Sequence, residues 1–417
     1  MADNKKNIGN QEESEKTAEK RGLKIFLAVL SFVILIIAVI YGRRFYTGIS
    51  PAFFPPPKDI AGNVASDNLG LKLPPGFSIS VFAQNLPGAR VMVKDVLGNM
   101  WVSQTSEGTV SLLEIDKETG KVVNQGPIFR DLNKPHGLAI NPENPFLLYI
   151  AEEDGIFAAP VYSEYDIRKI VDLPLSAGGH FTRTIGFGPD GKLYVSAGSS
   201  CNVCDENDYR RAKIFSMNAD GSDFSEFSKG LRNTVFFTWH PKTGDMWGTD
   251  MGRDFLGDDL PPDEINIIKK GNNYGWPICF GKNVHDGNFD KNVYFRNPCM
   301  EPFETGSYID IPAHSAPLGL AFVPEQGWPK DYQNNLMVAY HGSWNRSVPT
   351  GYKIVRIKLD ADGGFGGEKP EIEDFITGWL TPQGALGRPV GILIEPDGVM
   401  YVSDDKAGVI YKVVADK

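Results

Sequence analysis

From residue 73 onward, short apolar runs alternate with turns rich in Pro, Asp, Asn and Gly, and one unit recurs six times: an apolar strand, a turn and a second apolar strand. The copies are VMVKDVLGNMWVS from Val91, GLAINPENPFLLYIAEEDG from Gly137, IGFGPDGKLYVSAGS from Ile185, FFTWHPKTGDMWGTDMG from Phe236, GLAFVPEQGWPKDYQNNLMVAYHGS from Gly319 and GILIEPDGVMYVSDDKAG from Gly391. The first four start 46, 48 and 51 residues apart, which is the period of a four-stranded propeller blade. The pattern therefore predicts an all-β fold, a six-bladed β-propeller over residues 73–417.

Closure of the ring follows from the last repeat, which supplies three strands at 391–395, 399–403 and 408–413. The alternating segment Phe77 to Ala83 precedes the first repeat and has no other partner. Because open strand edges invite aggregation, we expect this segment to complete the last blade. The fifth and sixth copies follow longer gaps of 83 and 72 residues, so we expect insertions after the fourth blade to build a site over one face.

A different pattern precedes the repeats: residues 25–41 are apolar except for Ser31. At about 1.5 Å per residue this run reaches about 25 Å, the short end of a membrane-spanning helix. Six basic residues stand before it and two directly after it, which favours a cytoplasmic N-terminus. A cleaved signal peptide is the alternative, but Gly42-Arg43-Arg44-Phe45 stands where a small-residue cleavage site is needed.

The expected organisation is thus a cytoplasmic tail (1–24), a transmembrane helix (25–41), a Pro-rich spacer (42–72) and a propeller (73–417). The protein would be a single-pass protein of the cell membrane with its propeller in the periplasm or outside the cell. With 42 Lys plus Arg against 52 Asp plus Glu, the formal charge is -10. Nucleic acid is therefore not an expected partner.

The four cysteines agree with an oxidising compartment. Their even number predicts two disulfides, and we expect one between Cys279 and Cys299. A four-Cys zinc site is disfavoured by the wide spacing of this second pair and by the absence of a histidine cluster. Cys201 and Cys204 form a CxxC pair that could be redox-active, but no helical pattern follows it, so we interpret it as structural.

Candidate chemistry gathers near the predicted strand ends. Between Asp250 and Pro277 an irregular, acidic stretch suits either Ca²⁺ or a solvated turn; its carboxylates are Asp254, Asp258, Asp259, Asp263 and Glu264. Three of the six histidines and four arginines stand at matching strand ends: His180, His314, His341, Arg183, Arg232, Arg346 and Arg388. Their convergence at the propeller axis would suit an anionic ligand with planar carboxylates.

Seven segments in this order resemble the glucose/sorbosone dehydrogenase family, whose members are pyrroloquinoline quinone (PQQ) enzymes on a six-bladed propeller. They are GHFTRTIGFGPDGKLYVSAGSSCN, GLRNTVFFTWHP, RDFLGDDLPPDEIN, NYGWP, HSAPLGLAF, HGSWNRSVPTGYKIVRI and GRPVGILIEPDGVMYVSDD. The resemblance covers about residues 73 to 413 and is strongest to the sorbosone dehydrogenase-like branch.

The resemblance implies a reaction and a site. A sugar aldehyde or aldose would be oxidised at C1, with hydride passing to PQQ and electrons to a quinone or a cytochrome. The implied catalytic residues are the base His180 and Arg232, which stabilises charge on the quinone oxygen. The implied cofactor residues are Asn233, Arg346, Arg388, His314 and His341. The implied Ca²⁺ ligands are Gly252 and Arg253 for the ion at the quinone, and Glu264 and Tyr274 for a structural ion.

Two departures from the family pattern stand out. Val390 replaces a second basic residue of the soluble glucose enzymes, so we expect weaker cofactor binding, and Phe236 and Phe237 are bulkier than expected. The alternatives are a calcium-dependent, lactonase-like hydrolase and a cofactor-free carbohydrate-binding propeller. For the latter, tryptophans would stack on sugar, although we expect most of Trp101, Trp247, Trp276 and Trp344 to lie in the core.

Overall fold

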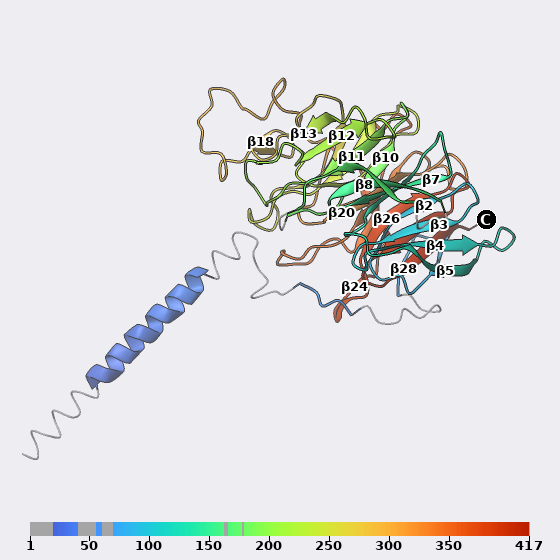
Figure 1. Cartoon of the computed structure of the whole chain (residues 1–417). Coiled ribbons are helices and arrows are strands. Elements are labelled where there is room, and N and C mark those ends of the chain that lie inside the picture. Colours follow the sequence, from blue (N-terminus) through green and yellow to red (C-terminus); the bar gives the residue numbers. More distant parts are fainter. Residues whose placement is uncertain (1–19, 41–55, 61–69, 162–165, 177–178, 417) are drawn as a thin grey trace, which may run out of the picture.

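The computed structural model describes residues 20–40, 56–60, 70–161, 166–176 and 179–416. Within them, strands form six four-stranded antiparallel sheets and two short hairpins, and the sheets are the blades of a propeller (Figure 1). This confirms the predicted all-β, six-bladed fold.

The first three blades follow the chain without exchange of strands. Blade one contains β2 (Ala89–Lys94), β3 (Met100–Gln104), β4 (Thr109–Ile115) and β5 (Val122–Phe129). Blade two contains β6 (Gly137–Ile140), β7 (Leu147–Glu152), β8 (Gly155–Pro160) and β9 (Arg168–Asp172). Blade three contains β10 (Ile185–Phe187), β11 (Leu193–Ala197), β12 (Lys213–Met217) and β13 (Ser225–Lys229).

The other three blades carry the insertions and the closure. Blade four contains β14 (Thr234–Trp239), β15 (Met246–Asp250), β16 (Asp263–Ile268) and β19 (Ile309–Ile311). Blade five contains β20 (Pro317–Phe322), β21 (Leu336–Tyr340), β22 (Lys353–Ile357) and β23 (Ile372–Ile376). Blade six contains β26 (Pro389–Ile394), β27 (Met400–Asp404), β28 (Val409–Ala415) and β1 (Phe77–Ala83).

The ring closes as predicted, because β1 pairs antiparallel with β28 from Phe77 opposite Ala415 to Ala83 opposite Ile410. Phe77 anchors this strand. Its ring lies 4.9 Å from that of Trp328 and 5.0 Å from those of Tyr332 and Phe375. The N-terminal strand is thus fixed to blade six by a ladder of hydrogen bonds and to blade five by aromatic packing.

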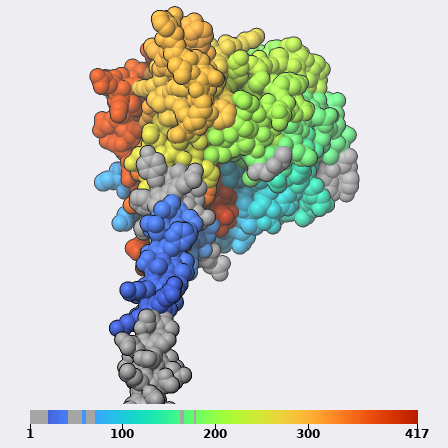
Figure 2. All heavy atoms as spheres, turned by 90° about the vertical axis from the view of Figure 1, so that its left-hand side faces the viewer, coloured from blue at the N-terminus to red at the C-terminus, as the bar shows by residue number. Residues whose placement is uncertain are grey.

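The long insertion lies inside blade four, between its third and fourth strands, rather than after the blade as expected. It carries the hairpin of β17 (Cys279–Phe280) and β18 (Val284–His285), and its yellow and orange atoms project at the top of Figure 2. The predicted Cys279–Cys299 disulfide is present here and joins residues 20 positions apart. A second hairpin, β24 (Leu380–Thr381) with β25 (Gly384–Ala385), precedes blade six.

Two pieces of the expected Pro-rich spacer contact the propeller. The amide of Ile60 donates to the carbonyl of Ala385 (2.8 Å), and the amide of Ala385 donates to that of Lys58 (2.8 Å). Lys72 likewise pairs with Thr377. The described part of the spacer therefore forms a single parallel β-bridge with the β24–β25 hairpin, at Asp59 and Ala385.

Upstream, Lys20–Ile40 is a helix of 21 residues that is long and apolar enough to cross a membrane (Figure 1). It confirms the predicted N-terminal apolar helix, although it begins five residues earlier than the apolar run. A signal sequence would meet the same criteria. The division of the chain into tail, span, spacer and propeller therefore stays a prediction.

Two of the four tryptophans named above belong to the core, fewer than expected, and Trp276 is half-buried. Trp101 and Trp247 are fully buried in a cluster shared by several blades. Trp344, in contrast, is 48% exposed. Stacking on a ligand is thus open to Trp344 but not to the two buried side chains.

Removing the anchor of the closing strand should destabilise the whole ring. We expect Phe77→Ala to lower the free energy of unfolding by about 3–5 kcal/mol, because a nearly buried aromatic side chain is lost from a packed cluster. Chemical denaturation of the full chain in detergent measures this change. Phe146→Ala is the matched control, because Phe146 is 59% exposed and its loss should change stability by less than about 0.5 kcal/mol. Equal effects of the two substitutions would contradict the anchoring role of Phe77.

Candidate active site

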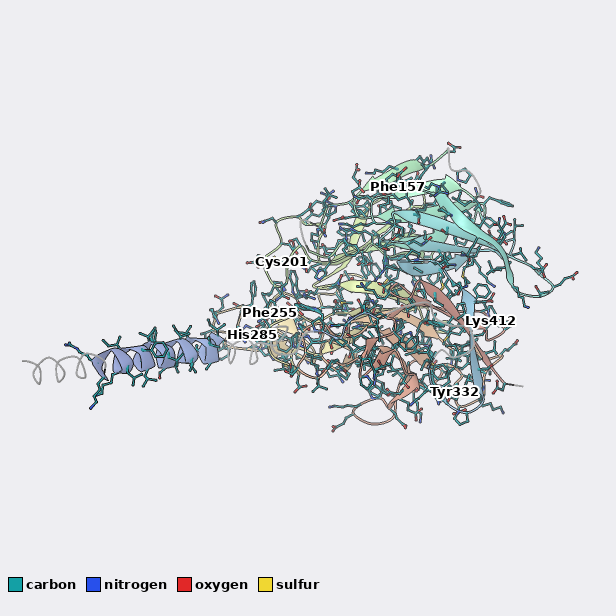
Figure 3. All side chains as sticks on the ribbon, turned by 90° about the horizontal axis from the view of Figure 1, so that it is seen from below. Phe157, Cys201, Phe255, His285, Tyr332 and Lys412 are labelled. Carbon is teal, nitrogen blue, oxygen red and sulfur yellow. A yellow bond between two sulfur atoms is a disulfide. The ribbon has the colours of Figure 1, made fainter. Side chains whose placement is uncertain are left out.

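The propeller geometry brings the predicted site residues to one end of the axis. In an antiparallel blade, the start of the first strand lies beside the end of the second. His180, Arg232, His314 and Arg388 precede a first strand by one to five residues, and His341 directly follows a second strand. These residues therefore lie on the same end of the ring. Figure 3 labels Cys201, which belongs to the loop that contacts His180, on the side of the propeller opposite Lys412.

His180 is held in one orientation by Ser199. Its Nδ1 lies 3.0 Å from the carbonyl oxygen of Ser199 and 3.0 Å from Ser199 Oγ. A carbonyl oxygen only accepts, and the hydroxyl of Ser199 donates to the carbonyl of Cys201 (2.7 Å), so Nδ1 carries the ring proton. This tautomer leaves Nε2 with its lone pair. Burial, and then the positive charge of Arg232, lower the pKa of His180 to about 3, so the ring is neutral at physiological pH.

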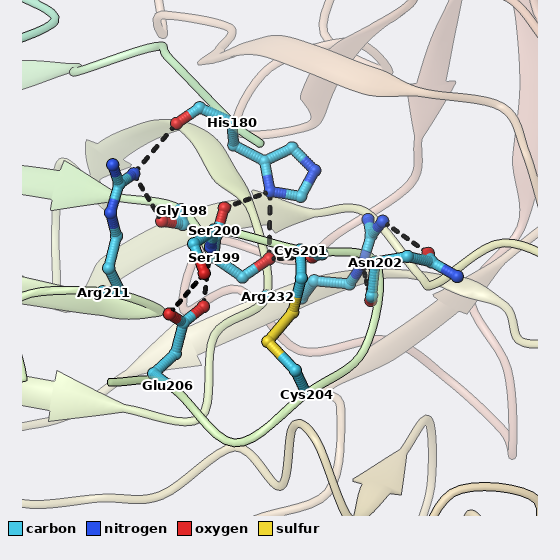
Figure 4. The surroundings of a disulfide bond; sticks show 10 residues. All are labelled: His180, Gly198, Ser199, Ser200, Cys201, Asn202, Cys204, Glu206, Arg211 and Arg232. Atoms are coloured by element: carbon cyan, nitrogen blue, oxygen red, sulfur yellow. Dashed lines mark hydrogen bonds between the residues drawn. A yellow bond between two sulfur atoms is a disulfide. The ribbon is translucent and has the colours of Figure 1, made fainter. Parts of the chain in front are cut away.

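Arg232 lies next to His180 and is almost fully buried. Its Nε donates to the carbonyl of Asn202 (2.9 Å) and its Nη2 to Oδ1 of the same residue (2.9 Å), as Figure 4 shows. Its Nη1 donates to the carbonyl of Met251 (3.2 Å), and Asp254 lies 3.6 Å away. The guanidinium group is therefore fixed from three sides.

Asn233 shares a wall with His180. A Cβ atom at Gly198 would lie 2.5 Å from Asn233 Oδ1 and 2.7 Å from His180 Cβ, so both side chains pack against a position where only glycine fits. The backbone N–H of Asn233 donates to the carboxylate of Asp250. Arg232 and Asn233 thus connect the surroundings of His180 to Asp250 at the end of β15.

Arg388 and Arg346 both point their charges toward carboxylates of this chain. Arg388 Nη1 donates to the carbonyl of Gly342 (3.0 Å), its guanidinium lies 4.6 Å from the ring centre of Tyr352, and its Nε meets Asp59 at 3.2 Å. Arg346 Nη2 donates to Asp259 (2.8 Å). Arg388 is nearly buried and oriented, whereas Arg346 stands at the more exposed rim.

The two other predicted histidines have defined partners. His314 Nε2 donates to the carbonyl of Gly257 (2.8 Å), and its Nδ1 lies 4.0 Å from Asp254. His341 Nε2 lies 3.0 Å from Asp405, which in turn binds Arg90 (2.7 Å). His314 therefore lies near Asp254, the carboxylate that also faces Arg232, whereas His341 is paired with Asp405 of blade six.

A cavity of about 330 Å³ opens beside these groups, a size in the range of small-molecule sites. Its charged and aromatic lining consists of Arg90, Lys134, Phe181, Asp405 and Lys406. Phe181 directly follows the base, and Lys406 shares Asp59 with Arg388. Each of these cations has a carboxylate partner in this chain, Arg90 with Asp405, Lys134 with Glu153 and Lys406 with Asp59. None of the predicted catalytic or cofactor residues lines the cavity itself. An anionic planar ligand such as PQQ would therefore compete with these carboxylates for the cations.

Sequence reasoning missed Arg90, Asp405 and Lys406. Arg90 could have been found from the sequence. It stands at the start of the first strand of blade one, and Arg232 and Arg388 stand just before the first strands of their blades. Asp405 and Lys406 had none, since an Asp-Asp-Lys turn after a strand is common on protein surfaces.

A second, smaller cavity of about 20 Å³ contains the predicted metal residues, room for one water-sized species. Gly252, Arg253, Glu264 and Tyr274 all line it. Asp250, which was not predicted, lines it too, directly opposite Glu264 in the β15–β16 ladder.

The carboxylates of this cavity fit a cation. Burial raises the pKa of Glu264 to about 7, and burial followed by the charge of Glu264 raises that of Asp250 well above its ordinary range. Two facing buried carboxylates are costly unless protonated or paired with a positive ion. Hard oxygen donors of this kind are the ligands that Ca²⁺ prefers.

The acidic stretch is less irregular than expected. Asp263 and Glu264 begin strand β16 and are buried, because their neighbours Ile265 and Ile268 belong to the core. Asp263 accepts from the amides of Gly252 (2.8 Å) and Ala316 (2.9 Å). Asp263 therefore ties the predicted calcium loop to the start of blade five.

The bulky Phe236 is explained by its place in the structure. It is 9% exposed, belongs to the largest core cluster and meets the ring of His136 at 5.3 Å. Its ring fills space among the inner strands rather than obstructing the cavity beside His180, whose lining does not include it.

Comparison with known proteins agrees with this architecture. A protein of Borreliella burgdorferi described as uncharacterized is 32% identical over 366 residues, which cover 83% of this chain and 91% of that protein. The calcium structure of a Trichoderma reesei carbohydrate-active enzyme of family AA12 superposes with a TM-score of 0.72 at 19% identity, over 85% of this chain and 99% of that one. At this identity the second similarity shows the fold alone.

A PQQ-dependent pyranose dehydrogenase of Coprinopsis cinerea is 36% identical over 117 residues, or 24% of this chain and 15% of that protein. The chain thus matches a small part of that relative, which supports the predicted PQQ sugar dehydrogenase superfamily. The sorbosone dehydrogenase-like branch stays a prediction. The TrAA12-like family model matches residues 71–416, and the chain belongs to the TrAA12-like family.

Proposed function

We propose that this protein is a membrane-anchored, PQQ- and Ca²⁺-dependent dehydrogenase that oxidises an aldose or a related sugar aldehyde at C1. The observation that carries the proposal is the fixed tautomer of His180, which leaves Nε2 unprotonated in a ring whose pKa is lowered by the nearby charge of Arg232. A neutral base next to a buried cation suits removal of a hydroxyl proton while negative charge develops nearby.

The residues divide this work. His180 Nε2 takes the proton from the anomeric hydroxyl, and Ser199 keeps the ring oriented through Nδ1. PQQ, when bound, supplies the acceptor for the hydride that leaves C1. Arg232 places its guanidinium where charge develops, held by Asn202 and Met251. The low pKa of His180 keeps the base unprotonated.

Cationic and amide side chains at the same end of the propeller as His180 would hold the cofactor. Arg388, Arg346 and Asn233 would bind its carboxylates and carbonyls, with His314 and His341 as the further cofactor residues that the resemblance implies. The resemblance implies one Ca²⁺ ion at Gly252 and Arg253 and another at Glu264 and Tyr274, but all four residues line one cavity with room for a single ion, so one Ca²⁺ would bind there. We add Asp250 to its ligands because Asp250 faces Glu264 across the ladder.

The proposal also includes location and electron flow. The helix Lys20–Ile40 would anchor the protein with its N-terminus in the cytoplasm and the propeller in the periplasm or outside the cell. Electrons would leave the reduced cofactor for a quinone or a cytochrome.

One experiment tests the activity. The purified full chain, given PQQ and Ca²⁺, should reduce a redox dye with at least one sugar of an aldose panel. Omission of PQQ should abolish the signal. Hydrolysis of lactones with Ca²⁺ alone would instead favour the lactonase-like alternative, and sugar binding without either reaction the carbohydrate-binding one.

We expect His180→Ala to lower turnover by about 10²–10⁴, the usual contribution of a positioned acid–base group, with little change in the Kd for PQQ. Arg346→Ala should instead raise that Kd about 10- to 150-fold, because one charge-assisted contact of about 1.5–3 kcal/mol is lost. Steady-state kinetics and PQQ titrations separate these effects. His285→Ala is the control, since His285 pairs with Asp290 on the insertion. Wild-type turnover of His180→Ala at saturating PQQ would remove His180 from the mechanism.

The metal should stabilise the fold in a pH-dependent way. Glu264 has a pKa of about 7 in the folded, metal-free protein, against its ordinary value of 4.5 in the unfolded chain. Between these two pH values the folded protein binds more protons than the unfolded chain, so the stability of the metal-free protein falls as pH rises from about 4.5 to 7. Ca²⁺ should therefore raise Tm by more degrees at pH 8 than at pH 6, and at 100 times Kd it should add about 2.7 kcal/mol to the free energy of unfolding. Scanning calorimetry with and without Ca²⁺ measures this. Glu264→Gln should lose the pH dependence, and the exposed Glu118→Gln should keep it; a Ca²⁺ effect that survives in Glu264→Gln would place the ion elsewhere.

Topology has a direct test. Protease added to intact cells should degrade the propeller and leave a short N-terminal fragment that contains Lys20–Ile40. A mature protein that starts near residue 45 would show a cleaved signal peptide instead.

A further inference from the structure

The Cys201–Cys204 disulfide lies close to the two proposed catalytic residues. It closes a CxxC loop that begins two residues after Ser199, with the cysteine Cα atoms 6.2 Å apart. Figure 4 shows His180 and Arg232 near this loop. Within the described part of the chain, residues 198–212 contain no helix or strand, so regular secondary structure does not hold this segment in place.

Asn202, inside the disulfide ring, makes the decisive contacts. Its carbonyl oxygen and its Oδ1 each accept from Arg232, at 2.9 Å for both Nε and Nη2. Two such bonds from one planar guanidinium to one residue determine both the position and the plane of that group. Oδ1 also accepts from the amide of Asp254 (2.8 Å), and Nδ2 donates to the Asp254 carbonyl (3.1 Å).

The other side of the loop reaches the base. Ser199, which orients His180, donates its hydroxyl to the carbonyl of Cys201 (2.7 Å). Ser200 is tied to Glu206 through its amide (2.6 Å) and its hydroxyl (2.7 Å). One short cross-linked segment thus supplies the orienting contacts of both His180 and Arg232.

We propose that the Cys201–Cys204 disulfide positions Arg232 through Asn202, and that turnover therefore depends on the redox state of this pair. Asn202 is a positioning residue, because it acts through Arg232. Reduction by a dithiol transfers two electrons and two protons, converts the disulfide into two thiols and oxidises the dithiol to its own disulfide. The opened loop then loses the constraint on the Asn202 carbonyl. The role of Arg232 in turnover rests on the proposed function.

Accessibility favours this pair over the other disulfide. Cys201 and Cys204 are half-buried, whereas Cys279 is 6% and Cys299 1% exposed. A mild dithiol should therefore reach the CxxC pair first. Mass spectrometry after alkylation identifies which thiols have formed.

The test uses the full chain in detergent and varies Asn202 without touching the cysteines. Asn202→Ala should lower turnover about 10- to 100-fold, the cost of misplacing a catalytic group by about 1 Å, in a protein that stays folded at the assay temperature, as its Tm will show. Asn202→Asp keeps the side-chain acceptor for Arg232 and should recover most of the turnover. Asn218→Ala, in an exposed turn of the same blade, is the matched control and should change nothing.

Reduction should reproduce the effect of Asn202→Ala and add little to it, because both act through one contact. The variant C201S/C204S should start at the reduced level and no longer respond to the dithiol. If Asn202→Ala and the reduced protein keep full turnover, or if C201S/C204S still responds, the positioning role is wrong.

A second readout needs neither PQQ nor substrate. Because the charge of Arg232 contributes to the low pKa of His180, displacement of Arg232 should raise that pKa. Proton NMR of the histidine ring follows the titration, with His180→Ala to assign its signal. We expect a higher pKa in Asn202→Ala and in the reduced protein. An unchanged titration would overturn the inference even if the protein proves inactive, whereas absence of PQQ-dependent activity together with a shifted titration would count only against the proposed function.

Discussion

The pairing of β1 with β28 is the constraint on which the rest of the structure depends. It joins the beginning of the propeller to its end, so the six first strands form a complete ring rather than an open arc. Most residues of the candidate site stand at strand ends in this ring or in the loops that follow them. An opened ring would separate blade six, with Arg388 and Asp405, from blades one to three, with Arg90 and His180.

Charge balance is the second organising feature. Arg90, Arg232 and Arg388 lie at the end of the propeller that carries the candidate site. Each of these arginines is largely buried and has a carboxylate or backbone carbonyls as hydrogen-bond partners. Arg90 binds Asp405, which also binds His341, and together they hold the pKa of Asp405 below its ordinary value against the opposing effect of burial. Pairs of this kind keep buried cations in place before any ligand arrives.

Asp59 adds a partner from outside the propeller. Its carboxylate lies 3.2 Å from Arg388 and 3.5 Å from Lys406, so a residue of the N-terminal segment neutralises part of the cationic end. The segment that leads toward the apolar helix thereby contacts the same arginine that is proposed to hold the cofactor. The described stretch 58–60 is thus held against the β24–β25 hairpin and Arg388 at once.

The sequence by itself determined the number of blades, the closing strand, the Cys279–Cys299 disulfide and the positions of His180 and Arg232, because these depend on local periodicity and on motifs within short segments. It did not reveal that Asp250 faces Glu264, since the 12 residues between β15 and β16 conceal the register of their ladder. Nor did it reveal the Arg90–Asp405 and Arg388–Asp59 pairs, whose members are 315 and 329 residues apart. The tertiary structure alone decided these contacts and the tautomer of His180, because side chains find partners only after ring closure has brought distant strand ends together.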